Sequence, residues 1–191
     1  MTDPMIVAMS DDKQFRVRLW VDEGYPNPRE ESLEDLTVYA VTVPDRHYAD
    51  VAGAGPLAEA WERVKTWSPH GVELFSRYAR IFHGAVTMHD APHDGPEVIW
   101  YMLPGGMAGV SDPMTYMKGW RDEYRAWASG EVFSYVIEEA VDWVRGDGQD
   151  GSKSTWEPVD DDEGSAWGLI GYEFAEEEAK REFSAFLQRN A

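Results

Sequence analysis

The stretch GEVFSYVIEEAVDWVR, residues 130–145, decides the fold that this sequence predicts. Phe133, Tyr135 and Ile137 alternate with smaller or polar residues, and a period of two is typical of a β-strand. The linker GDGQDGSKS and the segment TWEPV come next. Because turn residues between two extended segments are typical of a β-hairpin, we expect an antiparallel sheet here.

A second alternating stretch lies near the N-terminus, in the segment QFRVRLWVD at residues 14–22. Its apolar residues occupy one face and Arg16 and Arg18 occupy the other, which predicts a half-buried strand. Other segments are short, rich in β-branched or aromatic residues and bounded by Pro or Gly, as strands commonly are. These further strands are expected at 36–44, 85–88, 98–103 and 166–172.

Helical spacing of apolar residues marks the remaining segments. The segment 71–82 aligns Leu74, Tyr78 and Ile81, and the last helix is expected to turn its phenylalanines, Phe174 included, toward the core. Four helices are expected, at 56–67, 71–82, 112–128 and 173–188. The uneven order of five or six strands and about four helices favours an α+β fold with a mainly antiparallel sheet. The length of 191 residues favours one compact domain, and sub-lobes 1–70 and 71–191 are the alternative.

The composition excludes several classes of protein. The chain has no cysteine, so disulfides and cysteine-based metal sites are excluded. Its N-terminus has no basic segment followed by an apolar run, and no apolar stretch approaches the ~18 residues of a membrane span. We therefore expect a cytoplasmic protein without membrane contact.

The net charge of −19 is unevenly distributed along the chain. Residues 1–64 hold 13 acids and 6 bases, residues 65–127 hold 7 and 6, and residues 128–191 hold 16 and 5. This charge disfavours direct binding to nucleic acid or to anionic membranes, because both need a basic surface. It favours a partner protein with a basic surface.

Three segments resemble an uncharacterised protein family encoded by actinobacterial phages, plasmids and chromosomes. They are RYARIFHGA (77–85), GEVFSYVIEEAVDWVR (130–145) and WEPVDDDEGSAWGLIGYEFAEEEA (156–179), so the resemblance covers roughly the second half of the chain. A Ser-Cys pair often precedes the W-G turn of the family, whereas this chain has Ser165-Ala166. The resemblance implies a phage or mobile-element origin, and it supplies no known activity or functional residue.

Histidines and carboxylates suggest an enzyme as the alternative function. Imidazole and carboxylate groups are ligands of zinc and iron, but an extended chain separates His83 from His89 by about 20 Å. A cation site is therefore restricted to a small set of weak candidates: His89, Asp90, His93 and Asp94. The His83-Gly84 pair also resembles part of an ADP-ribosyltransferase signature, although Ala85 replaces its hydroxyl residue. We assign no catalytic residue, no metal and no cofactor on these patterns.

The charge pattern instead predicts a binding protein that inhibits a host nucleic-acid-binding or defence protein through a carboxylate-rich surface resembling DNA. Carboxylates would replace phosphates in the basic cleft of that partner. The residues assigned to the contact are Glu138, Glu139, Asp142, Asp160, Asp161, Asp162, Glu163, Glu173, Glu176 and Glu177. A structural or assembly protein is a further alternative, and the oligomeric state stays open.

Overall fold

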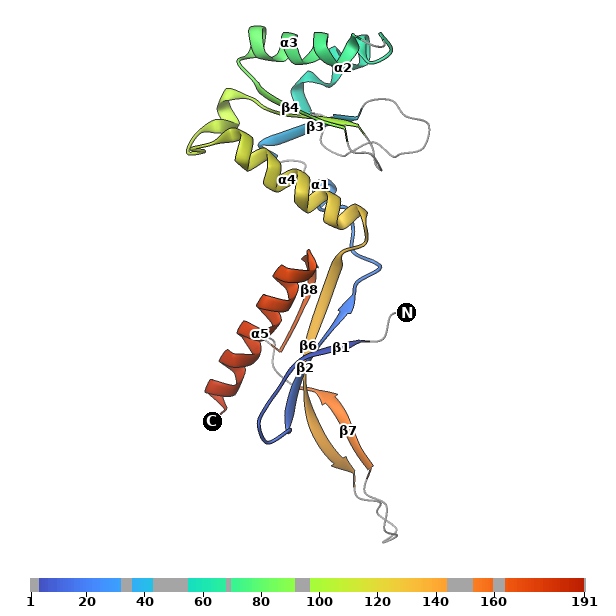
Figure 1. Cartoon of the computed structure of the whole chain (residues 1–191), viewed down its shortest axis with the longest axis vertical. Coiled ribbons are helices and arrows are strands. Elements are labelled where there is room, and N and C mark those ends of the chain that lie inside the picture. The colour runs from blue at the N-terminus through green and yellow to red at the C-terminus, as the bar shows by residue number, and fades with distance from the viewer. Residues whose placement is uncertain are drawn as a thin grey trace. The chain divides into compact units, whose positions relative to one another are not determined.

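The described residues form eight β-strands in two antiparallel sheets, one of five strands and one of three, in the computed structural model of this protein (Figure 1). The structure describes residues 4–31, 36–42, 55–67, 70–91, 97–143, 153–159 and 164–190. Helices accompany both sheets, which confirms the predicted α+β class. The chain divides into two compact units, unit 1 (Met1–Tyr25 and Ala126–Ala191) and unit 2 (Pro26–Arg125).

The long strand β6 (Val132–Trp143) organises the sheet of unit 1. One edge of β6 pairs with β2 (Phe15–Val21), and β2 in turn pairs with β1 (Met5–Met9). The other edge pairs first with β8 (Ser165–Ile170) and then with β7 (Lys153–Pro158). The predicted long strand and its hairpin partner are thus confirmed, whereas β1 lies in a segment where no strand was expected.

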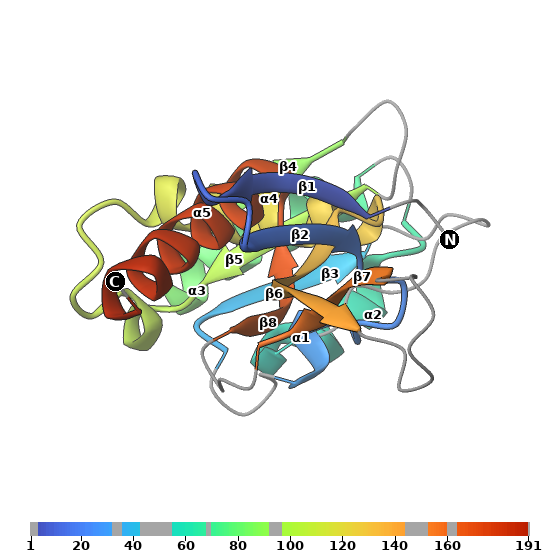
Figure 2. The same ribbon diagram turned by 90° about the horizontal axis from the view of Figure 1, so that it is seen from below.

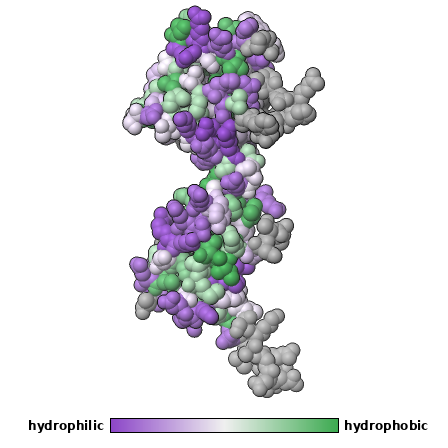
Figure 3. Space-filling model, viewed as in Figure 1, coloured by the Kyte–Doolittle hydropathy of each residue, from purple (hydrophilic) through white to green (hydrophobic). Residues whose placement is uncertain are grey.

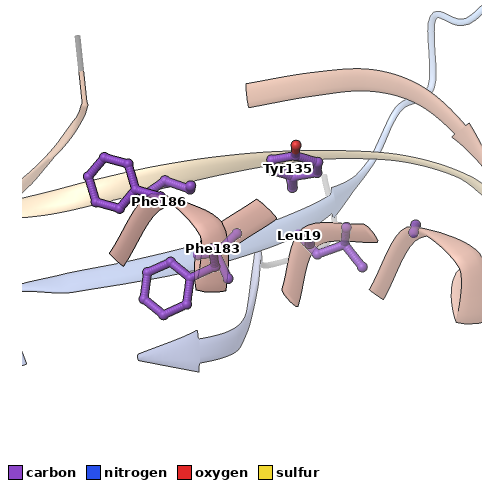
Figure 4. Packing of buried hydrophobic residues seen from close by; sticks show 8 residues of the cluster. Leu19, Tyr135, Phe183 and Phe186 are labelled. Carbon is purple, nitrogen blue, oxygen red and sulfur yellow. The ribbon is translucent and has the colours of Figure 1, made fainter. Parts of the chain in front are cut away.

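Helix α5 (Tyr172–Arg189) packs on one face of this sheet (Figures 1 and 2). Residues at alternate positions of β2 and β6 meet residues spaced three or four apart on α5, which is why one face of each element is apolar. Figure 4 shows Leu19, Tyr135, Phe183 and Phe186 in this core. Its buried members are Val17, Leu19, Tyr135, Ile137, Ala175, Ala179, Phe183 and Phe186.

The predicted inward position of Phe174 is wrong, because its side chain is exposed. Ala175 and Ala179 are fully buried and set the rotation of α5 about its axis. At about 100° per residue, Phe174 lies about 100° around the helix from Ala175 and about 140° from Ala179. The small alanine side chains therefore bring the helix onto the sheet, and Phe174 is left outside.

Gly168 allows β8 to pack tightly against Tyr25, the last residue of the N-terminal part of unit 1. Its backbone is left-handed, with φ at +72°, and a Cβ built on it would lie 2.1 Å from the ring of Tyr25. Any other residue would be strained and would displace that ring. Part of the W-G turn noted in the sequence thus has a packing role.

The three strands of unit 2 follow the order β3–β5–β4 (Val38–Thr42, Val98–Met102 and Val86–Asp90). Helices α2 (Ala58–Val64) and α3 (Gly71–His83) lie on one face of the sheet, and α4 (Pro113–Ala128) and α1 (Pro28–Glu31) lie on the other (Figure 1). Short 3₁₀ helices occupy Gly55–Leu57 and Pro104–Met107. Because both faces are covered, every residue of β5 is buried.

Aromatic contacts connect the layers of unit 2. Phe75 of α3 packs edge-on against Trp61 of α2 and Tyr101 of β5, with ring centroids 5.3 and 5.7 Å apart. On the other face of β5, Trp100 meets Tyr124 of α4 at 6.0 Å. Edge-to-face rings at these separations stabilise a core beyond the area that they bury.

The ends of two helices agree with the sequence-based expectation. The Asp112 carboxylate accepts hydrogen bonds from the backbone N–H groups of Met114 and Thr115, so Asp112 caps α4. Gly84 ends α3 in the left-handed conformation, with φ at +63°. Local sequence is sufficient to predict both ends, because each is decided by a residue next to the helix.

The two units do not divide at residue 70, where the alternative sub-lobe boundary was expected. Helices α2 and α3, on either side of that position, both belong to unit 2 and share one cluster of buried residues. Unit 1 is built from both ends of the chain, since β2 pairs with β6. A composition change along the chain does not reveal such a pairing.

Candidate functional site

Glu138, the first carboxylate assigned to partner binding, forms two ion pairs inside unit 1. The register of β2 and β6 places Arg16 directly opposite Glu138, and Arg18 follows on the same face. Arg16 Nε donates to Glu138 Oε2 at 2.6 Å, and Arg18 Nη2 pairs with Glu138 Oε1. The Glu138 side chain is only 3% exposed. The assignment of Glu138 to a partner contact is therefore wrong.

Trp156 completes this buried group on the sheet face opposite α5. It lies on β7 beside Ala140, and the guanidinium carbon of Arg16 is 4.1 Å from the centroid of its indole ring. A guanidinium over an indole face is an attractive cation–π contact. The Arg16–Arg18–Glu138–Trp156 cluster thus connects β2, β6 and β7. The alternation of Arg16 and Arg18 was visible in the sequence, but their counter-charge required the strand register.

The next carboxylates of β6 remain at the surface. Glu139 is exposed and points to the face opposite that of Glu138, because side chains alternate along a strand. It lies directly across from Glu157 of β7, so two carboxylates share this part of the sheet. Asp142 is exposed near the end of the strand. Like charges directly opposite each other in a sheet are mutually unfavourable.

Helix α5 carries a mixture of paired and free carboxylates. Glu176 accepts a hydrogen bond from Lys180 at 2.7 Å, which raises the pKa of Lys180. Arg181 in turn pairs with two further glutamates, Glu178 and Glu182. Within the described part of the chain, Glu173 and Glu177 form no such ion pair, and both are exposed.

Unit 1 also exposes aromatic side chains on α5 and on β8. Phe174 is 55% exposed on α5, and Trp167 of β8 is 64% exposed. At about 100° per residue, Phe174 lies beside Glu173 and Glu177 on the solvent side of the helix. We call Glu173, Phe174 and Glu177 the α5 surface. Hydrophilic residues gather over α5 (Figure 3).

The remaining predicted carboxylates, Asp160, Asp161, Asp162 and Glu163, lie outside the described residues. By sequence they belong to unit 1, which holds 21 acids and 8 bases for a net charge of −13. Unit 2 holds 15 acids and 9 bases, a net charge of −6. Most of the negative charge of the chain therefore belongs to unit 1.

The predicted histidine sites are not assembled where the structure describes them. His89 pairs with Glu97, while Asp90 accepts a hydrogen bond from Arg125 at 2.8 Å. His83 is the last residue of α3 and packs against Tyr78, whereas the ADP-ribosyltransferase pattern needs this histidine on a strand. His93 and Asp94 lie outside the described residues. Among those that are described, no three His, Asp or Glu side chains are grouped to hold a metal ion.

Sequence reasoning also missed a buried arginine in unit 2. The Arg29 guanidinium carbon lies 5.0 Å from the ring centroid of Trp100 and 5.4 Å from that of Trp120. Arg29 Nη2 donates to the Val38 carbonyl oxygen at 2.8 Å, and burial lowers the pKa of Arg29 to about 10. Burial also raises the pKa of Glu123. Arg29 connects α1 to β3 and to the indoles beside α4, which is a structural role.

No protein-family model, curated protein or solved structure matches this chain. None of the helices in the part of the chain that the structure describes has the length and apolarity needed to cross a membrane. Function must therefore be inferred from the residues of this chain alone, and the α5 surface is the candidate site.

Proposed function

We propose that the protein acts by binding a second protein that has a basic surface, and that unit 1 makes the contact. The observation that carries this proposal is the α5 surface, where the exposed carboxylates of Glu173 and Glu177 lie beside the exposed ring of Phe174. The net charge of −13 on unit 1 supports it.

In such an interface, charge attracts the partner and apolar contact supplies much of the binding energy. A strongly negative unit attracts a basic partner over distances of about a Debye length, which speeds association. At contact, carboxylates accept charge-assisted hydrogen bonds from arginine and lysine. An aromatic side chain then supplies the buried apolar area that usually dominates the energy of an interface. Glu138 takes no part, because its charge is already neutralised by Arg16 and Arg18.

In its specific form, the proposal is that the partner is a host nucleic-acid-binding or defence protein. Residues one helical turn apart, such as Glu173 and Glu177, have Cβ atoms about 6 Å apart. Carboxylates repeated at such short intervals can replace phosphates in a cleft built for nucleic acid. The protein would then inhibit its partner in the cytoplasm of the host, in keeping with a phage or mobile-element origin.

Affinity capture from a lysate of the natural host at two salt concentrations tests the proposal. A basic partner should be retained at about 50 mM salt and largely lost at about 300 mM, because screening weakens contacts between charges. Its affinity is then measured with purified components. Competition with duplex DNA should displace this protein from the partner if the contact replaces nucleic acid.

A matched pair of double variants locates the contact. Glu173→Lys with Glu177→Lys should weaken binding by at least about ten-fold, since two charge-assisted contacts become repulsions. Glu59→Lys with Glu62→Lys changes the net charge equally, at two exposed glutamates on α2 of unit 2, and should leave binding nearly unchanged. Equal losses in both variants, or capture of no basic protein at low salt, would contradict the proposal.

A further inference from the structure

The face of the unit 1 sheet opposite α5 carries two arginines that converge on one point. None of the described helices of unit 1 packs on this face, since α5 lies on the other (Figure 1). The side chains of Arg16 and Arg18 are 15% and 29% exposed, so solvent reaches both. Their guanidinium groups lie close together, because each pairs with a different oxygen of the Glu138 carboxylate. A ligand at this point can therefore contact both arginines at once.

This group of side chains holds more positive than negative charge. Glu138 balances only one of the two arginines, which leaves a formal positive charge on a unit of net charge −13. Along β2, the next carboxylate on this face is Asp22, four residues after Arg18. Along β6 it is Asp142, four residues after Glu138. At 3.3 Å per residue each lies about 13 Å away, which exceeds the Debye length of about 8 Å, so they do not cancel the local charge.

Hydrogen-bond donors of the two arginines remain unpaired. Arg16 engages Glu138 through Nε, and Arg18 engages it through Nη2. The other nitrogens of these guanidinium groups have no hydrogen-bond partner among the described residues. Arg18 Nε is also buried, and an unpaired buried donor is costly. An oxyanion beside the two groups would supply the second negative charge that Glu138 does not provide.

Exposed apolar side chains of β1 lie next to the arginines. The register of β1 and β2 places Ile6 directly opposite Arg18. The same pairing places Met9 opposite Arg16, and directly paired residues share one face of a sheet. Ile6 and Met9 are 48% and 41% exposed. On the other side, the ring of Trp156 lies against the Arg16 guanidinium. The positive centre is thus bordered by apolar surface that a ligand can cover.

We propose that Arg16 and Arg18 bind the carboxylate of a small organic acid whose apolar body rests on Ile6 and Met9. A monoanion brings the charged group to neutrality, whereas the dianion of inorganic phosphate would leave it negative. The planar carboxylate also matches the planar fork of guanidinium donors. Each methylene group that the apolar side chains cover strengthens binding by up to about four-fold. This site lies on the sheet face opposite α5 and does not depend on the proposed function.

Titration with sodium hexanoate tests the site, with sodium chloride used to hold the ionic strength constant. In protein labelled with ¹⁵N-arginine, the Nε–H signals of Arg16 and Arg18 should shift and saturate with a dissociation constant in the millimolar range. Arg16→Lys and Arg18→Lys each remove one signal and so assign the two. Absence of a shift at these signals would overturn the proposal. Equal, unsaturated shifts at all arginines would also overturn it, since they mean an adventitious ion only.

A comparison of probes defines the chemistry of the ligand. Acetate should bind at least about ten-fold more weakly than hexanoate, because it lacks four methylene groups. Inorganic phosphate should also bind more weakly than hexanoate, and uncharged 1-hexanol should not shift the two signals. Equal affinities for acetate and hexanoate, or tighter binding of phosphate, would overturn the assignment of an apolar carboxylate.

A matched pair of variants locates the charge contact. Arg18→Gln should weaken hexanoate binding by at least about ten-fold, since it removes a charge-assisted contact and leaves the hydrogen bond from Arg16 to Glu138 in place. Arg77→Gln, the same change at an exposed arginine of α3 in unit 2, should leave binding unchanged. Near-ultraviolet circular dichroism checks that both variants are folded. A folded Arg18→Gln variant that binds hexanoate like the wild type would overturn the proposal.

A surface variant separates the apolar contact from the charge. Ile6→Ser changes an exposed side chain, so the fold should persist. It should weaken hexanoate binding by about four-fold and leave acetate binding within about two-fold of the wild type. Hexanoate affinity that is unaffected by Ile6→Ser would overturn the contact with β1.

Discussion

Glu138 and Glu139 are adjacent in sequence but differ completely in environment. Glu138 is buried between Arg16 and Arg18, whereas Glu139 is exposed on the other face of β6. Glu138→Ala should lower the free energy of unfolding by about 3 kcal/mol, because it leaves two largely covered arginines without their counter-charge. Urea denaturation at neutral pH measures the change.

Glu139→Ala is the matched control for this prediction, with the same change one position along the same strand. Its effect should stay within about 0.5 kcal/mol, since it removes an exposed side chain. A loss of similar size in both variants would mean that the Glu138 ion pairs contribute nothing specific to stability.

Tyr101 makes the stability of unit 2 depend on pH in alkaline solution. Burial raises the pKa of Tyr101 to about 12, although the hydrogen bond that its oxygen accepts from the Leu57 N–H at 3.2 Å acts in the opposite direction. An unfolded tyrosine has a pKa of about 10. The neutral phenol therefore contributes stability that is complete below pH 10 and is lost as the pH rises through about 12.

The variant Tyr101→Phe isolates this contribution, because the other tyrosines titrate equally in both proteins. Between pH 8 and pH 11 the wild type should lose about 1.4 kcal/mol more unfolding free energy than the variant. Denaturant titrations of the two proteins at both pH values give the difference. A parallel decline of both proteins would contradict a raised pKa at Tyr101.

At the scale of single elements, the rotation of α5 about its axis determines which phenylalanine side chains stabilise the core. Phe183 lies in the core of unit 1, and Phe174 lies on the α5 surface. Phe183→Ala should cost about 3–4 kcal/mol of unfolding free energy, whereas Phe174→Ala on the same helix should cost less than about 0.5 kcal/mol. Thermal and urea unfolding of the two variants compare them directly. A greater cost at Phe174 would mean that the helix packs through its other face.

At the scale of the whole molecule, two clusters of buried residues share no member, one in each unit. If the units open separately, Phe183→Ala should speed amide hydrogen exchange in β2 and β6 by about 100-fold and leave β3 and β5 nearly unchanged. Mass spectrometry of peptides after exchange measures both units in one experiment. Equal acceleration in the two units would instead support the prediction of one cooperative domain over residues 1–191.

Several features of the fold could be predicted from local sequence. The period of two fixes β2 and β6, and helix ends at Asp112 and Gly84 depend on single residues beside the helix. The weak alternation in β1 gave no such signal. The carboxylates at Glu139, Glu173 and Glu177 were also identified as surface residues, because charged side chains are rarely buried without a partner.

The sequence by itself determined the α+β class, most of the strands and helices and the excess of negative charge, since each depends on residue types at short spacing. Only the tertiary structure decided that Glu138 is neutralised inside the sheet, that Phe174 faces solvent and that Ile81 of α3 is exposed. Each of these depends on contacts between residues far apart in the chain. Strand register determines the partners of Glu138. Close packing at Ala175 and Phe75 determines which face of α5 and of α3 is buried.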